Sequence, residues 1–180
     1  MSAPAVLAVD PAQRTGIAML FGDRIWCHTL KLRRVPPKAV DLALVLADLA
    51  PRMPWHEAPA WHLVVERMYG GGNAATSIIS AQTAGQLYQE LARMREFASE
   101  AFPYASQWRS VLHAQGRINR ARAKATAIEL VERRFGVTVD DNAAEAVCMA
   151  LWRREDLEHE ARRVALGLDL PRNGKPRPRK

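Results

Sequence analysis

Three short apolar segments separated by polar turns occupy the first thirty residues. Residues 4–10 have the pattern of a buried strand that ends in an acid, and residues 15–21 and 24–30 follow as two further strands around a Gly-Asp turn. Strands joined by connections this short pair antiparallel. The pattern therefore predicts a three-stranded antiparallel unit.

Beyond residue 36, segments with helical spacing alternate with short apolar runs. The predicted helices span residues 39–50, 75–98, 119–135 and 141–154, and the predicted strands span 61–67 and 100–105. The second helix is expected to direct Ile78, Ile79, Leu87, Leu91 and Met94 towards the core or a dimer contact. The order β-β-β-α-β-α-β-α-α predicts an α/β fold, with a mixed sheet of about five strands and helices on both faces.

We expect one globular domain over residues 1–154. Residues 155–170 are predicted as a helical extension, which either continues the last helix or forms a short one of its own. Residues 171–180 are basic and rich in Pro, so we expect a disordered tail there. The 180-residue length suits a single domain of this kind.

Composition and charge narrow the class of protein. No apolar run has the roughly 18 residues of a membrane span, and the N-terminus lacks the basic start of a secretory signal. Two isolated cysteines fit a reducing cytoplasm. The formal net charge is +7, with five positive charges in the last ten residues and a second basic region over residues 109–134. This positive charge indicates nucleic acid as the partner. The alternative is that the charges only form an ordinary solvated surface and a solubilising tail.

Two acids, Asp10 and Glu66, each end a run with the pattern of a buried strand. If the two strands are parallel neighbours, both side chains meet at one edge of the sheet, where open α/β sheets place their sites. Carboxylates this close repel unless a cation lies between them, and Mg²⁺ or Mn²⁺ suits oxygen ligands.

A third acidic group lies in the segment "VDDNAAEAV". Asp141 and Asn142 precede Glu145 by four and three residues, which places each on one helix face with it. Four such ligands could hold two cations about 4 Å apart, an arrangement that supports phosphodiester hydrolysis. Alternatively, Asn142 and Glu145 form a capping box, and Asp140 is a further candidate for the helix cap.

Four segments in this order resemble the RuvC-type Holliday-junction resolvases of the ribonuclease H-like superfamily, in particular the shorter phage-like ones. They are "LAVDPAQRTGIA", "LVVERMY", "WRSVL" with a Lys on the next helix, and "DDNAAEAVCMA". The resemblance covers the chain to about residue 153. It implies a homodimer that binds a four-way DNA junction and cuts two opposed strands with two Mg²⁺ ions per site, for which Mn²⁺ could substitute.

The resemblance carries Asp10 and Glu66 over as metal ligands. The closing motif departs from the family, because Glu145 stands where Asp is usual and Asn142 where some members have Asp or His. We expect Asp141 and Glu145 to complete the ligand set, with Asn142 in reserve. The resemblance also implies a bacterial or phage protein that lies in the cytoplasm and is associated with the nucleoid.

Further candidates lie around these acids. Lys124 is expected to contact the scissile phosphate, the alternative being a solvated helix position. Tyr69 is a candidate for stacking on a base, or an ordinary loop residue. Trp108 is interpreted as a helix anchor. The candidates for phosphate contacts are Arg109, Arg117, Arg120 and Arg122.

Three alternatives remain open. A ribonuclease H-like site could act on structured RNA or on other branched DNA. The departures at Asn142 and Glu145 would also fit a junction-binding protein without catalysis. An actin-like nucleotide-binding protein shares the sheet order but needs a second domain.

Overall fold

A five-stranded mixed sheet forms the centre of the computed structural model, which describes residues 3–67, 74–112 and 119–168. Its order is β3-β2-β1-β4-β5, with β1, β2 and β3 antiparallel and β4 and β5 parallel to β1. The strands are β1 (Ala5–Asp10), β2 (Arg14–Phe21), β3 (Arg24–Lys31), β4 (Trp61–Val65) and β5 (Ser99–Ala101). The predicted α/β fold is confirmed.

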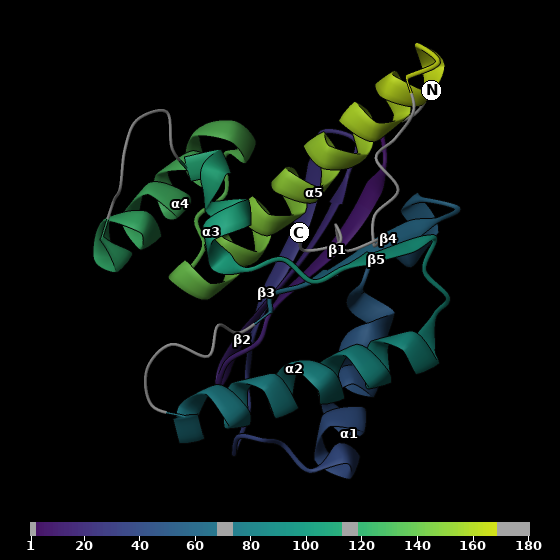
Figure 1. The fold of residues 1–180 in the computed structure, drawn as a ribbon. Coiled ribbons are helices and arrows are strands. Elements are labelled where there is room, and N and C mark those ends of the chain that lie inside the picture. Colours follow the sequence, from purple (N-terminus) through teal and green to yellow (C-terminus); the bar gives the residue numbers. More distant parts are fainter. Residues whose placement is uncertain (1–2, 68–73, 113–118, 169–180) are drawn as a thin grey trace, which may run out of the picture.

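Helices cover both faces of the sheet (Figure 1). One face carries α1 (Ala39–Leu49) and α2 (Ala74–Met94), and the other carries α3 (Ala105–Trp108), α4 (Arg120–Phe135) and α5 (Asp141–Ala165). Single 3₁₀ turns occupy Ala50–Arg52, Trp55–Glu57 and Arg109–Leu112. No helix in the described part of the chain is long and apolar enough to cross a membrane.

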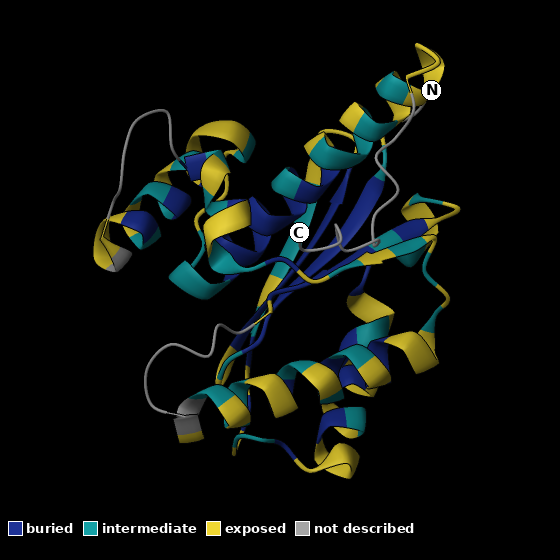
Figure 2. Ribbon diagram, in the orientation of Figure 1, coloured by how far each residue is buried: buried dark blue, intermediate teal, exposed yellow. Residues whose placement is uncertain are grey.

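Buried residues lie in the sheet and on the helices of both its faces (Figure 2), and the core has two layers. Leu7 and Val9 pack with α1 and α2, whereas Val6 and Ala8 pack with α4 and α5. The strand is buried along its whole length, as expected for a central strand covered on both faces. The residue that follows Ala8 on the α5 side is Asp10.

The second helix is shorter than expected. The prediction ran to residue 98, but α2 ends at Met94. Residues 95–98 leave the helix because the Ala98 N–H donates to the Trp61 carbonyl at 2.8 Å, which draws the chain towards β4. Leu87 and Leu91 are fully buried, as expected for a core face, whereas Ile78 and Met94 are 57% and 37% exposed and do not belong to the core. The dimer contact, the alternative for this face, stays a prediction.

The helix ends on the α5 side follow local chemistry. Asn119 caps α4 through its side chain, and Gly136 ends it in the left-handed conformation at φ 69°. Asp140 caps α5, so Asn142 lies inside the helix and the capping-box alternative for it is wrong. The helix α5 continues without a break past residue 154 to Ala165. The division of the chain at residue 154 stays a prediction, and the tail lies outside the described residues.

Candidate metal centre

Parallel pairing of β1 and β4 brings Asp10 and Glu66 together. Val9 faces Val65 in the register, and the Glu66 N–H donates to the Val9 carbonyl at 3.0 Å. Because side chains alternate along a strand, Glu66 shares the α5 face with Val64, as Asp10 does with Ala8. Both carboxylates are more than 90% buried. The sequence prediction that they meet at one edge of the sheet is therefore consistent with the observed register.

The third buried carboxylate, Glu145, comes from the first turns of α5 and is only 4% exposed. This helix can approach the sheet closely because Gly16 of β2 lies beneath it. Gly16 pairs with Asp10 of β1 in the sheet register. A Cβ atom on Gly16 would lie 2.6 Å from the carbonyl carbon of Asn142 and closer still to its oxygen. Gly16, in the Thr-Gly pair after the first turn, is therefore a packing requirement for this helix.

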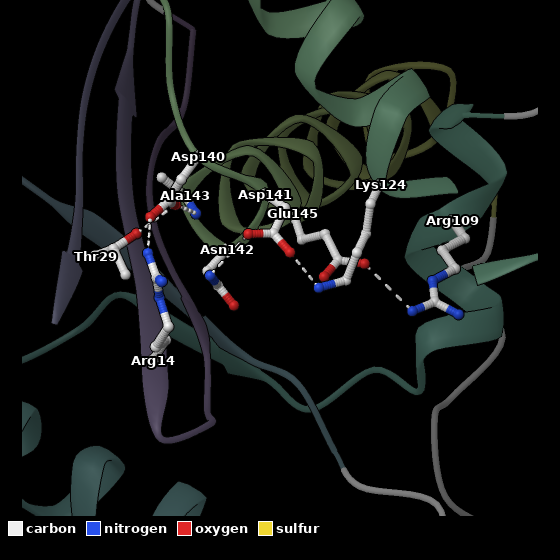
Figure 3. A network of polar contacts seen from close by, with 9 residues as sticks. All are labelled: Arg14, Thr29, Arg109, Lys124, Asp140, Asp141, Asn142, Ala143 and Glu145. Atoms are coloured by element: carbon white, nitrogen blue, oxygen red, sulfur yellow. Dashed lines mark hydrogen bonds and ion pairs between the residues drawn. The ribbon is translucent and has the colours of Figure 1, made fainter. Parts of the chain in front are cut away.

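A separate anchor fixes the start of α5 against the outer strands (Figure 3). The Asp140 carboxylate accepts hydrogen bonds from Thr29 Oγ1 at 2.6 Å, from Arg14 at 2.9 Å and from the Ala143 N–H at 3.0 Å. Burial raises the pKa of Asp140, but these hydrogen bonds outweigh it, so the pKa is lowered overall. Asp140 thus has a structural role, as expected for a helix cap.

Asp10 lies in an unfavourable electrostatic environment for a charged carboxylate. Burial raises its pKa well above the usual value, and the nearby Glu66 and Glu145 carboxylates raise it further. A hydrogen bond with Glu66 acts in the same direction, and only the Lys124 ammonium opposes them. Three carboxyl groups from β1, the end of β4 and α5 therefore share a region with too little positive charge, which is the condition that a bound cation relieves.

Two basic side chains lie on the α4 side of the acids (Figure 3). Lys124 forms an ion pair with Asp141, and Arg109 lies 3.4 Å from a Glu145 oxygen. Asn142 donates its amide N–H to Asp141 at 3.0 Å, so its side-chain oxygen is the atom left for a ligand role. The sequence made Arg109 a candidate for phosphate contacts, which stays a prediction; the structure places it beside a carboxylate and 29% exposed.

Trp108 makes a contact with Glu66 that the sequence did not reveal. Its indole N–H donates to a Glu66 oxygen at 3.1 Å, and the residue is fully buried. The next residue is Arg109, so one short turn contacts Glu66 and Glu145 with consecutive side chains. Nothing in the local pattern distinguishes this Trp from one that only fills the core.

The remaining predicted residues are placed as follows. Asp141 and Asn142 are half-buried beside the three acids, and Asp141 is joined to them through Lys124. Arg122 is exposed on α4. Tyr69, Arg117 and the side chain of Arg120 lie outside the described residues.

The donor set suits a hard divalent cation, because carboxylate oxygens from three elements lie together with their charge only partly compensated. Within the described ranges, however, no group of three His, Cys, Asp or Glu side chains is arranged to hold a metal ion as it stands. Instead, Glu66 accepts a hydrogen bond from Trp108, and Glu145 accepts one from Arg109.

Solved structures share this fold. A Thermus thermophilus RuvC in complex with Holliday junction substrate superposes with a TM-score of 0.58 at 13% identity, over 91% of this chain and 96% of that one. A second Thermus thermophilus RuvC structure gives 0.56 at 12% identity, over the same shares. No family model and no curated protein matches the sequence. The likeness establishes the fold, whereas membership of the phage-like branch stays a prediction.

Proposed function

We propose that this chain is a divalent-metal-dependent endonuclease that cuts four-way DNA junctions. The observation that carries the proposal is the set of three buried carboxylates, Asp10, Glu66 and Glu145, at the edge of a RuvC-like sheet. Burying three mutually repelling acids costs stability, and binding of a cation at the site would offset that cost. Hydrolysis of a phosphodiester is the reaction for which such oxygen ligands are suited.

Asp10, Glu66 and Glu145 would hold the metal ions, with Asp141 or the Asn142 oxygen completing the set. Two Mg²⁺ ions, or Mn²⁺ in their place, would supply an activated water and stabilise the leaving oxygen. Trp108 orients the Glu66 carboxylate through its indole N–H. The helix α5 holds Glu145 over the sheet, where the hydrogen bonds of Asp140 fix the first turn.

Lys124 and Arg109 are the positive groups that would meet the substrate phosphate. Both form ion pairs with acids of the site, and both side chains are about one-quarter exposed. An anionic phosphodiester that enters the site offers each an alternative partner. Lys124 is therefore proposed to stabilise the charge that develops on the phosphate.

The four-way junction is proposed as substrate because the Thermus thermophilus neighbour of the same fold holds one. Two opposed strands of a symmetric junction are cut most simply by a two-fold symmetric enzyme, so we propose a homodimer. Arg117, Arg120 and Arg122 would contact phosphates near the site, and Tyr69 would stack on a base at the junction centre.

The test is cleavage of a labelled four-way junction, with a linear duplex and the matching RNA junction as controls, in Mg²⁺, Mn²⁺ or EDTA. We expect paired symmetric nicks on the DNA junction that disappear in EDTA. Asp10→Asn should abolish cleavage and keep junction binding. Asp48→Asn, a matched change at a side chain that is 78% exposed, should cut normally. Cleavage by Asp10→Asn at the unaltered rate would contradict the proposal.

A junction-binding protein without catalysis is the second candidate. The observation in its favour is that Arg109 and Lys124 neutralise Glu145 and Asp141 without a metal. Tight junction binding with no cleavage in Mn²⁺ would favour this candidate. Cleavage of the RNA junction alone would instead indicate a nuclease for structured RNA.

A further inference from the structure

A second group of cations lies at the same edge of the sheet as the acids, at the end of the outer strand β3. The connection from β3 to α1 carries four basic residues, Lys31, Arg33, Arg34 and Lys38, which we call the basic loop. All four are exposed. Within the described ranges none of them has a carboxylate ion-pair partner, and the nearest acid along the chain is Asp41.

The sheet register places the basic loop relative to the proposed metal centre. Asp10 faces Gly16 on β2, Gly16 faces Thr29 on β3, and Lys31 lies two residues further along β3. The Leu32 N–H donates to the Gln13 carbonyl at 2.9 Å, so the loop starts beside the turn that follows Asp10. Two strand spacings and two residues of rise put the Lys31 and Asp10 Cα atoms about 12 Å apart.

This separation suits a DNA duplex. It is close to the roughly 12 Å width of the major groove. A duplex with one phosphate at the carboxylates can therefore place the facing backbone over the basic loop. Arg109 and Lys124 contact acids of the site from the α4 face, whereas the basic loop leads to the α1 face (Figure 1).

The charges of the basic loop oppose the stability of the fold. Four like charges within eight residues repel one another. Lys38 also occupies the N-cap position of α1 without a capping hydrogen bond, where a cation is unfavourable for the helix dipole. An external polyanion reverses both effects.

We infer that the basic loop binds backbone phosphates of the DNA duplex arm that leads away from the metal centre, without reading its sequence. The inference rests on the proposed nuclease function for the position of the DNA. Its chemistry is that of phosphate contacts, in which each Lys or Arg displaces counterions from the duplex.

The test compares two triple variants that lose the same charge. The loop variant is Lys31→Gln, Arg33→Gln, Lys38→Gln, and it keeps Arg34 because its Nε donates to the Pro36 carbonyl. The control variant is Arg52→Gln, Arg93→Gln, Arg162→Gln, at side chains that are 65%, 69% and 78% exposed. Arg52 lies in the 3₁₀ turn after α1, and the other two lie in the last turns of α2 and α5. Binding of a labelled junction, of a linear DNA duplex and of the matching RNA duplex is measured in EDTA over a range of salt concentrations.

The loop variant should bind both DNAs at least about tenfold more weakly at low salt. Its slope of log Kd against log salt should fall by about 0.9 for each phosphate that is no longer neutralised, or roughly 2–3 in total. The control variant should keep the unaltered slope and affinity within about twofold. Each single loop substitution should lower the slope by about 1, which keeps the test valid if the triple variant does not fold.

The outcomes separate this inference from the proposed function. If the unaltered protein cuts junctions and the loop variant binds with an unchanged slope, the inference is overturned and the nuclease stands. If the unaltered protein cuts nothing but the loop variant still loses affinity and slope, the surface stands and the nuclease fails. A loss confined to an RNA duplex would overturn the assignment to DNA.

Discussion

Replacing Gly16 by Ala tests whether the close approach of α5 to the sheet builds the proposed site. Gly16 faces Asp10 across β1 and β2, and the backbone of Asn142 lies directly against it. The added Cβ would stand 2.6 Å from the Asn142 carbonyl carbon and 3.2 Å from the Ala143 nitrogen. Both neighbours are backbone atoms, which cannot rotate away as a side chain can.

The magnitude follows from the shortfall in distance. Carbon atoms pack at about 3.5–4.0 Å, so the first turn of α5 must move by about 1 Å. Glu145 follows this turn directly in the helix and would move with it, away from Asp10 and Glu66. Overpacking of this kind costs about 1–3 kcal/mol of stability. A 1 Å displacement of catalytic groups costs roughly 100-fold in rate.

The assay compares junction cleavage and thermal unfolding of Gly16→Ala with those of Gly85→Ala. Gly85 lies within α2, and a Cβ there meets nothing within 4 Å. The Gly85 variant should therefore gain up to about 1 kcal/mol of stability and cut normally. If Gly16→Ala is as stable and as active as the unaltered protein, the helix does not depend on this contact and the reasoning fails.

Three further predictions concern individual side chains. Trp108→Phe keeps an aromatic ring at this buried position but removes the hydrogen bond to Glu66. Cleavage should therefore fall about 10–100-fold, and the Mn²⁺ concentration that cleavage requires should rise. An unchanged dependence on metal concentration would count against an orienting role. Burial, with the nearby Glu145, raises the pKa of the Cys148 thiol to about 12, so mass spectrometry after alkylation at pH 8 should find this residue unmodified until the protein unfolds; rapid labelling of the native protein would contradict its burial. Burial and the nearby Arg153 lower the pKa of His62 below 6.5. The unfolded chain then binds the proton more readily, so stability present above pH 6.5 should be lost as the pH falls below it, and His62→Gln should flatten the melting temperature between pH 7 and 5.

The positions of Asp10 and Glu66 could be predicted from sequence because they depend on two local patterns. Each acid ends an apolar run, and parallel strands align their carboxyl ends. Glu145 could be identified as a candidate from its spacing to Asp141, since residues four apart share a helix face. These inferences need no knowledge of how the helices dock.

The contacts that depend on docking were outside the reach of sequence. Trp108 meets Glu66 only because α3 and the turn after it pack over the end of β4, and an indole that fills a core has the same sequence pattern. Arg109 could be named as a candidate for phosphate contacts from its charge, but its ion pair with Glu145 of α5 could not be predicted. Whether Ile78 on α2 belongs to the core could not be decided from sequence, because apolar character does not determine which helix face meets the sheet.

The distribution of charge explains why the proposed site needs cations on both of its sides. Without bound metal, three buried carboxylates repel the phosphate on which they are to act, so attraction for DNA in EDTA must come from elsewhere on the molecule. Arg109 and Lys124 are partly neutralised by the acids they contact, whereas the cations of the basic loop have no such partners in the described structure. Loss of the basic loop should therefore weaken binding and leave kcat at saturating DNA unchanged, whereas loss of Lys124 should lower kcat itself. Equal effects of the two changes on kcat would contradict this division of roles.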